Sequence, residues 1–357
     1  MAGRGVDLAL FSVGADLPYL IGYDAMNLPR LTMLVVPRDG DATLVIPNLE
    51  VARVVERPGV FGIRGWAETE DPIDIVAGLS GSPSSVAVGD QTWARNVVDL
   101  LGRLPGARWS RATELVGPLR ARKDPAEVEA LRTAAQAADR VAAQLHAGEI
   151  PLVGHTEAEV SAELSRRLLA EGHTHVNFAI VAAGPHAASP HHEAGATVIR
   201  PGEVVLCDFG GSFPMADGEP GYCSDITRCV YTGEPPGEFA ELYAVLWEAQ
   251  SAAVAAGTVG TPAEEVDGAA RRVITAAGFG DRFIHRTGHG IGIFEHEDPY
   301  IVAGNGVPLE GGNAFSIEPG IYLPGRFGAR LEDIVVATDD GPDPLNVVEH
   351  GLVVVEA

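Results

Sequence analysis

Four acidic residues lie inside stretches of the chain that otherwise read as buried β-strands, and this pattern constrains the fold more than any other feature. The stretches are residues 204–210, 224–228, 316–320 and 330–334, and the acids are Asp208, Asp225, Glu318 and Glu332. The first two acids are 17 residues apart and the last two are 14 apart, separations that fit neighbouring strands of a hairpin. Since cross-strand neighbours lie about 5 Å apart, the pattern predicts that the four carboxylates converge.

A convergent group of ionised carboxylates is too costly to bury unless positive charge cancels it. Two divalent cations would cancel it, and oxygen-rich ligation favours hard or borderline metals such as Mn²⁺ and Co²⁺. Each acid taken alone also has an ordinary explanation, such as an ion pair between Asp225 and Arg228 or between Glu332 and Arg330. The repetition of the pattern in four apolar strands favours a metal centre over separate ion pairs.

Histidine supplies a further ligand type in a glycine-rich stretch. Residues 285–292, "HRTGHGIG", place His285 and His289 four apart, and His296 follows. Glycine here lets the backbone approach a metal or a substrate closely. The spacing alone is a weak signal, because the stretch is too rich in glycine to be a metalloprotease helix. A second cluster contains His191, upstream of the first acid, and its local sequence alone is typical of a surface loop.

Charge and composition exclude several classes of partner. The chain has 357 residues with 25 Lys and Arg against 49 Asp and Glu, a formal net charge of -24. Binding to nucleic acid depends on clustered basic residues, so we expect neither nucleic acid nor an anionic membrane as a partner. No window offers about 18 consecutive apolar residues, and residues 1–23 lack the pattern of a signal peptide. Three cysteines without a paired framework read as reduced thiols. We therefore expect a cytoplasmic protein.

The length predicts two domains, and the local signals suggest where they divide. Residues 1–117 alternate short strands with short helices, which indicates a small α/β unit. A basic stretch then ends in Asp124-Pro125, a helix cap followed by proline at the first helical position. From residue 118 onward, helices alternate with hairpins, which predicts an α+β domain with helices on one face of a curved antiparallel sheet. The expected helices are 126–147, 156–172, 239–256 and 261–278, and the expected strands are 176–182, 204–209, 223–231, 314–322, 331–337 and 352–355.

These residues together resemble a known family. The ordered set Asp208, Asp225, His289, Glu318 and Glu332 is similar to the five metal ligands of the pita-bread (M24) metallopeptidases, which include methionine aminopeptidase, aminopeptidase P and prolidase. The flanking words "SDITR", "HRTGHGIG", "HEDP", "SIEPGIY" and "RLED" most resemble the Xaa-Pro branch. The resemblance implies an α/β creatinase-like N-terminal domain over residues 1–117, followed by an α+β pita-bread catalytic domain over residues 118–357.

The resemblance also implies a role for each ligand. Asp225 and Glu332 would bridge two divalent metal ions, with Asp208 completing one site and His289 and Glu318 the other. Manganese is the favoured metal, with cobalt, zinc or iron as alternatives. A water or hydroxide between the ions would be the nucleophile, its pKa lowered by the metal charge. Glu318 would also carry a proton towards the leaving amine.

Four further residues match positions that line the substrate site in the family. Three histidines would stabilise the tetrahedral intermediate, and an arginine would support the metal ligands or meet a substrate carboxylate. These residues are His191, His285, His296 and Arg330. The implied reaction is hydrolysis of the bond preceding proline in a peptide substrate. That bond is a tertiary amide without an N–H, and two metals can activate it without that missing donor. Family resemblance further suggests a homodimer.

One position departs from the dipeptide-cleaving members of the family. Some prolidases carry an arginine just after the His-Glu-x-Pro segment, where it holds the C-terminal carboxylate of the substrate. This chain has Tyr300 there, and residues 296–322 contain no Arg or Lys. Longer Xaa-Pro peptides are therefore favoured over strict dipeptides, unless Arg330 or a partner subunit supplies the charge.

Two other functions fit the same fold. The dinuclear centre could act on a small non-peptide amide or related substrate, as a hydrolase or lyase, because one sequence does not show the pocket contacts that set specificity. A non-catalytic interaction module is the third reading. The presence of all five ligand residues disfavours it.

Overall fold

The computed structural model describes residues 1–215 and 221–356, which divide into two compact units between Arg120 and Ala121. The division falls inside helix α4 (Thr113–Ala121), close to the boundary expected between residues 117 and 118. That exact boundary stays a prediction. The two units are described separately below.

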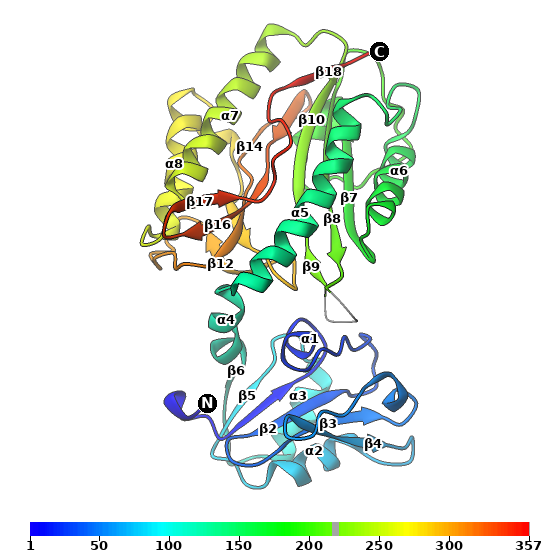
Figure 1. Ribbon diagram of the computed structural model, residues 1–357, viewed down its shortest axis with the longest axis vertical. Helices are drawn as coiled ribbons and strands as arrows, with labels where there is room; N and C mark the ends of the chain where they lie inside the picture. Colours follow the sequence, from blue (N-terminus) through cyan, green and yellow to red (C-terminus); the bar gives the residue numbers. More distant parts are fainter. Residues whose placement is uncertain (216–220, 357) are drawn as a thin grey trace. The chain divides into compact units, whose positions relative to one another are not determined.

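The N-terminal unit is built on a six-stranded mixed sheet with the strand order β4-β3-β2-β1-β5-β6 (Figure 1). Its strands are β1 (Leu8–Phe11), β2 (Met33–Pro37), β3 (Ala42–Pro47), β4 (Phe61–Trp66), β5 (Ser85–Val88) and β6 (Arg108–Arg111). Its helices are α1 (Asp16–Ile21), α2 (Pro72–Ser80), α3 (Ala94–Arg103) and α4. Successive side chains of a strand point to opposite faces, so Leu8 and Leu10 enter one core while Ala9 and Phe11 enter the other. The α/β character expected for this region is confirmed.

The C-terminal unit contains two five-stranded sheets. The first has the order β18-β10-β8-β7, with β9 paired to β8, and the second has the order β12-β11-β13-β16-β17. The strands of the first sheet are β7 (His175–Ala183), β8 (Val204–Phe213), β9 (Tyr222–Cys223), β10 (Ile226–Thr232) and β18 (Val353–Val355). Those of the second are β11 (Gly288–Gly290), β12 (Glu297–Ile301), β13 (Ala314–Ile317), β16 (Asp333–Thr338) and β17 (Gly341–Pro344). A separate hairpin joins β14 (Gly320–Leu323) to β15 (Phe327–Arg330).

Four helices belong to this unit: α5 (Pro125–His146), α6 (Glu157–Ala170), α7 (Gly237–Ala256) and α8 (Ala263–Ala276). The expected caps are present, since Asp124 accepts hydrogen bonds from the N–H groups of Ala126 and Glu127 at the start of α5. Thr156 and Glu159 form the expected capping box at the start of α6. A cap residue satisfies N–H groups that have no partner inside the helix, so the sequence defines these helix starts.

The packing of β8 decides which way its acid points. Val205 and Cys207 belong to a core shared with α5 and α6, whereas Val204 and Leu206 belong to the core shared with α7, α8 and the second sheet. Asp208 has the parity of Leu206, and side chains two apart share a face. The strand therefore directs this carboxylate towards the second sheet.

Two of the expected strands are interrupted, and this corrects one prediction. The expected strand 314–322 breaks at Glu318-Pro319, between β13 and β14, because proline has no N–H for a strand ladder. The expected strand 223–231 breaks at Ser224-Asp225, between β9 and β10. Glu332 directly precedes β16. The placement of every acid within a strand is therefore wrong for three of the four, which lie at strand ends.

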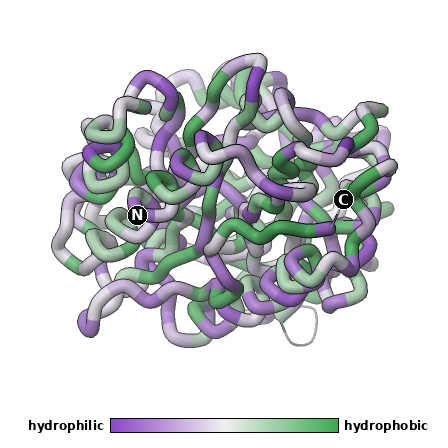
Figure 2. Tube along the Cα trace, turned by 90° about the horizontal axis from the view of Figure 1, so that it is seen from above, coloured by the Kyte–Doolittle hydropathy of each residue, from purple (hydrophilic) through white to green (hydrophobic). Residues whose placement is uncertain are grey.

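Hydrophobic and hydrophilic residues alternate in short stretches along the trace of the chain (Figure 2). None of the helices among the described residues is long and apolar enough to cross a lipid bilayer.

Candidate metal centre

Strand pairing brings the four acids to one place, as the sequence predicts. Asp208 on β8 pairs with Thr227 on β10, two residues after Asp225. Ile317 pairs with Asp333, so Glu318 and Glu332 flank the end of the β13–β16 ladder. An isolated bridge between Thr227 and Glu332 then links the two sheets. The acids therefore meet where inner strands of the two sheets, β8 and β10 of one and β13 and β16 of the other, come together.

All nine residues singled out from the sequence line one cavity of about 420 Å³. They are Asp208, Asp225, His289, Glu318, Glu332, His191, His285, His296 and Arg330. Arg286 and three apolar residues complete the wall: Phe178 and Ile180 on β7, and Pro190 in the segment that follows it. A mostly apolar cleft with a few convergent polar groups is the usual form of a small-molecule site.

Three ligand candidates lie close enough to share one ion. The donor atoms of Asp225, His289 and Glu332 all lie within 4.8 Å of one another. His289 Nε2 is 3.7 Å from Asp225 Oδ2 and 3.3 Å from Glu318 Oε1. Asp208 lines the same cavity and forms an ion pair with Arg330. The structure thus groups Asp225, Glu318 and Glu332 with His289, and it places Asp208 near enough to Asp225 to raise the pKa of that carboxyl while being paired with Arg330.

Hydrogen bonding leaves His289 ready to act as a ligand. Its Nδ1 lies 3.2 Å from the carbonyl oxygen of Gly290, so this nitrogen carries the proton and donates. The lone pair is then on Nε2, which faces the carboxylates. Burial, followed by the charge of His296, lowers the pKa of His289 to about 3. The imidazole is neutral, which is the form that binds a metal.

The carboxylates carry negative charge that the surrounding protein does not balance. Burial raises the pKa of Asp225 and of Glu332 well above the usual range, and the neighbouring carboxylates raise both further. Burial also raises the pKa of Glu318 to about 7, although Arg330 opposes the shift. Asp208 Oδ1 and Asp225 Oδ1 are buried and accept no hydrogen bond from the described residues. Unpartnered buried oxygens and raised carboxyl pKa values together fit a site built for cations.

Neutral side chains that the sequence analysis missed orient two of the ligands. Thr227 Oγ1 donates to Glu332 Oε2 at 2.6 Å. Ser316 Oγ donates to Glu318 Oε1 at 3.2 Å and accepts from the N–H of His289 at 3.0 Å. Hydroxyl groups that hydrogen-bond to a metal ligand hold that ligand in the orientation needed to bind the ion. The only sequence signal was their alternation with the acids, at i+2 after Asp225 and i−2 before Glu318.

Close approach of two strands explains one glycine of the "HRTGHGIG" stretch. A Cβ added to Gly288 would lie 1.8 Å from the carbonyl oxygen of Ser316. Any side chain there would push β11 away from β13, and His289 would move with it. This glycine is required by the backbone approach that places the ligand.

Arg330, Tyr322 and His285 form a hydrogen-bonded chain at the cavity wall. Arg330 Nη1 donates to Tyr322 Oη at 2.9 Å, and Tyr322 Oη lies 2.8 Å from His285 Nε2. His285 Nδ1 lies 2.7 Å from the carbonyl oxygen of Arg286 and must donate to it, so its Nε2 accepts from the tyrosine hydroxyl. Burial, followed by the charge of Arg330, lowers the pKa of His285 to about 4. Both ring nitrogens of His285 are therefore engaged, and Tyr322, a buried residue that the sequence analysis missed, links His285 to Arg330 from behind the cavity lining.

The other two histidines are more accessible. His296 is exposed and stacks against His289 with ring centroids 4.0 Å apart. Burial of part of the ring, followed by the charge of Arg286, lowers its pKa. His191 is also exposed and lies on the cavity wall. These two imidazoles can reach a molecule in the cavity without losing a described partner.

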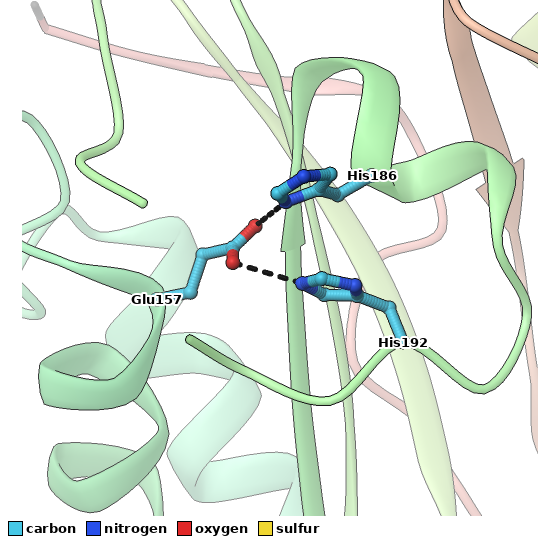
Figure 3. Close-up of side chains that lie close together, drawn as sticks. All are labelled: Glu157, His186 and His192. Carbon is cyan, nitrogen blue, oxygen red and sulfur yellow. Dashed lines mark hydrogen bonds and ion pairs between the residues drawn. The ribbon is translucent and has the colours of Figure 1, made fainter. Parts of the chain in front are cut away.

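A second group of ligand-type residues lies on another part of this unit (Figure 3). Glu157 Oε1 accepts from Ala183 N–H and His186 Nδ1, both at 2.9 Å, and Oε2 accepts from His192 Nε2 at 2.8 Å. The N–H of Gly195 completes the set at 3.4 Å. Burial raises the pKa of Glu157, but these hydrogen bonds outweigh burial and lower it overall. The carboxylate is fully satisfied, and it ties together both ends of the segment that carries His191.

Comparison with known proteins places this architecture. The model of metallopeptidase family M24 matches residues 129–339, and the creatinase/prolidase N-terminal domain matches residues 1–122. The chain belongs to metallopeptidase family M24. The family membership and the fold class expected from the sequence are both confirmed, and membership implies divalent metal ions as cofactors.

Three relatives of this M24 chain extend over nearly its whole length. The probable dipeptidase PepE of Mycobacterium tuberculosis is 44% identical, covering 99% of this chain and 93% of the relative. The Xaa-Pro dipeptidase of Lactobacillus helveticus is 37% identical, covering 94% and 91%. The crystal structure of a prolidase from Thermococcus sibiricus superimposes with a TM-score of 0.93 at 34% identity, covering 99% of this chain and 96% of that one.

Proposed function

We propose that this chain is a metallopeptidase that hydrolyses the bond preceding proline, with two divalent ions held by five side chains. These side chains are Asp208, Asp225, His289, Glu318 and Glu332. The observation that carries the proposal is the buried, uncompensated carboxylate group on the wall of a substrate-sized cavity. The names of the relatives, dipeptidase and Xaa-Pro dipeptidase, support the choice of substrate.

The donor set suits the proposed ions. When bound, two divalent ions polarise the scissile carbonyl and lower the pKa of the attacking water. Four carboxylates with one neutral imidazole match the oxygen-rich ligation of Mn²⁺. We propose manganese as the native metal, with cobalt, zinc or iron as alternatives.

Glu318 is the residue placed to move a proton. Its carboxylate lies on the cavity wall, and burial raises its pKa to about 7 in the absence of an ion. A group whose pKa is near the working pH both accepts and releases protons readily. We assign it the transfer of a proton to the nitrogen of the leaving proline.

The histidines divide into two roles. His296 is neutral, exposed to the cavity and next to His289, so it can donate an N–H to the oxygen that gains charge as the carbonyl is attacked. His191 can act in the same way from another part of the wall. His285 instead holds Tyr322 in place: its Nδ1 donates to the carbonyl oxygen of Arg286, its Nε2 accepts from the tyrosine hydroxyl, and that hydroxyl accepts from Arg330.

The apolar part of the wall fits the rest of the substrate. Phe178, Ile180 and Pro190 face the same cavity as the ligands. A proline ring lacks an N–H and offers mainly apolar surface, so such a wall binds it without leaving a buried donor unpaired.

We further propose a cytoplasmic homodimer that binds neither nucleic acid nor membranes. Three free buried cysteines fit a reducing compartment, and the net charge of -24 opposes polyanions. The homodimer rests on family resemblance, and light scattering of the purified protein tests it.

A panel of substrates tests the proposed function. The purified protein is stripped with a chelator, reloaded with Mn²⁺, and assayed on Leu-Pro, Leu-Pro-Gly and the control dipeptide Leu-Ala. We expect metal-dependent hydrolysis of the Xaa-Pro substrates and at least tenfold less of Leu-Ala. Bound metal without turnover of any peptide would contradict the proposal and favour a small non-peptide substrate. A protein that binds no metal would favour the non-catalytic reading.

A further inference from the structure

The cavity contains two guanidinium groups, and only one of them is free to bind a substrate. The side chain of Arg330 is 3% exposed. Its Nε donates to Thr227, its Nη1 to Tyr322, and its Nη2 to Asp208. All of its nitrogens are engaged, so a substrate carboxylate could recruit Arg330 only by breaking an existing buried ion pair, which is costly.

Arg286 is in the opposite situation. It is half-buried and lines the same cavity. Within residues 1–215 and 221–356, its side chain forms no ion pair and donates no hydrogen bond, although its charge partly opposes the effect of burial, which raises the pKa of Glu318. It packs instead against an aromatic ring. The Cζ atom lies 4.4 Å from the centroid of the Tyr300 ring. A guanidinium stacked on an aromatic ring is held in orientation, and its N–H groups remain available in its own plane.

The chemistry of this group selects its ligand. A guanidinium fork matches a carboxylate through two parallel hydrogen bonds, which is a geometry that neutral groups do not offer. The carboxylates nearest to the cavity are the ligand candidates already assigned to the metal ions. An anion on the substrate is the partner that remains.

We propose that Arg286 binds a carboxylate of the peptide substrate. The inference rests on the proposed function and adds a preference within it. The carboxylate has two sources: the C-terminus of an Xaa-Pro dipeptide, or an acidic side chain ahead of the proline. With the first source, this chain selects dipeptides although residue 300 is tyrosine, because the cation is supplied by the arginine stacked on that tyrosine.

Paired substrates with and without each carboxylate test the proposal. One arm compares Leu-Pro with Leu-Pro amide, and the other compares Glu-Pro with Gln-Pro. The wild-type protein should prefer the acid in at least one arm, and Arg286→Gln should reduce that preference by roughly 10- to 100-fold, the range of a charged hydrogen bond. The change should be in KM for the acid, and any effect of the lost charge on His296 is shared by the acid and the neutral substrate, so it cancels in their ratio. Arg286→Lys keeps the charge without the fork and should restore part of the preference.

The first arm responding alone assigns the C-terminal carboxylate, and the second responding alone assigns the acidic side chain. Unchanged ratios in both arms would overturn the inference. Arg282→Gln is the matched control, because Arg282 is exposed, lies four residues earlier and does not line the cavity. Arg282→Gln removes the same charge and should leave the preference for the acid over the neutral substrate as in the wild type in both arms.

Calorimetry on the metal-free protein separates this inference from the proposed function. Leu-Pro should bind more tightly than Leu-Pro amide, or Glu-Pro more tightly than Gln-Pro, and Arg286→Gln should remove that difference. If no substrate is hydrolysed but the binding difference is present and depends on Arg286, the proposed function fails and the carboxylate site stands. If peptides are hydrolysed and neither binding nor KM responds, the carboxylate site fails alone.

Discussion

Two groups of three side chains in the C-terminal unit are drawn from the same residue types, histidine and carboxylate, but differ in how their charge is balanced. One is Asp225, His289 and Glu332, and the other is Glu157, His186 and His192. The Glu157 carboxylate accepts four hydrogen bonds, and its pKa is lowered. Burial and like charges raise the pKa of Asp225, and its Oδ1 has no described partner. Ligand types alone therefore do not identify a metal centre; the balance of donors and charge does.

The largest effect should come from Asp225→Asn, which removes a charge that the proposed ions require. We expect activity to be abolished and bound metal to fall, as measured by elemental analysis of the purified variant. Because the pKa of Asp225 is raised, the metal-free variant should be more stable than the metal-free wild type at neutral pH. If Asp225→Asn turned over normally with two ions bound, the group that contains Asp225 could not be the metal centre, and the two groups would no longer differ in function.

His296→Ala tests a residue that adjoins the first group without belonging to it. We expect kcat to fall by about 10²–10³, the effect of losing one donor to a developing oxyanion, while metal content stays unchanged. His155→Ala, at an exposed histidine outside the cavity, is the control and should leave kcat unaltered. An unchanged kcat in His296→Ala would reject the assigned role.

In the metal-free protein, the carboxylates of the cavity and the carboxylate of Glu157 should change the free energy of unfolding in opposite directions as pH rises. Glu318 has a folded pKa of about 7, above its unfolded value of about 4.3. The folded state therefore binds the proton more tightly, and its contribution to stability is complete below the unfolded pKa and is lost as pH rises through 7. Asp225 and Glu332 act in the same direction. Glu157, whose pKa is lowered, contributes above its unfolded pKa and loses that contribution as pH falls.

Urea unfolding in the presence of a chelator measures this dependence. The free energy of unfolding should fall by a few kcal/mol between pH 5 and pH 8, since one unit of pKa shift corresponds to about 1.4 kcal/mol. With Mn²⁺ present, bound cations hold the carboxylates ionised and the decrease should disappear. A metal-free protein whose stability rises across this range would contradict the charge imbalance assigned to the cavity.

The smallest effect should come from Glu157→Gln. Loss of its charged hydrogen bonds should lower the free energy of unfolding by about 1–3 kcal/mol, measured by urea unfolding, without changing the number of bound ions. Glu193→Gln, at an exposed acid of the same segment, should change stability by less than about 0.5 kcal/mol. Loss of a bound ion in Glu157→Gln would show that this group is itself a metal site.

Much of the candidate site could be predicted from the sequence because its constraints are local. Asp208 within an apolar run signals a buried acid, and the 17-residue separation from Asp225 signals antiparallel pairing, which β8 and β10 confirm. The starts of α5 and α6 could also be predicted, because Asp124 and Thr156 accept hydrogen bonds from N–H groups within the first turn of their own helices.

The remaining features depend on partners that are distant in sequence. Glu157 and His192 are 35 residues apart, and the hydrogen bond from Arg330 to Tyr322 crosses a turn whose geometry no motif specifies. The hydrophobic pattern also failed to predict the interruption of two strands at Asp225 and Glu318. The first break separates two strands that both pair with β8, and the second depends on Pro319 and on the change of sheet between β13 and β14. The sequence did not indicate a role for Arg286, because a cation without an ion-pair partner can be recognised only when the residues around it are known.

The cavity is lined by the candidate ligands, which come from both sheets, and by the apolar residues Phe178, Ile180 and Pro190. The apolar residues lie on β7 and in the segment after it, which carry none of the five proposed metal ligands, so they can be replaced without removing a ligand. A substitution there would alter the surface offered to the proline ring while the proposed ligands stay in place. Substrate preference can therefore change within one architecture through substitutions in this part of the cavity wall.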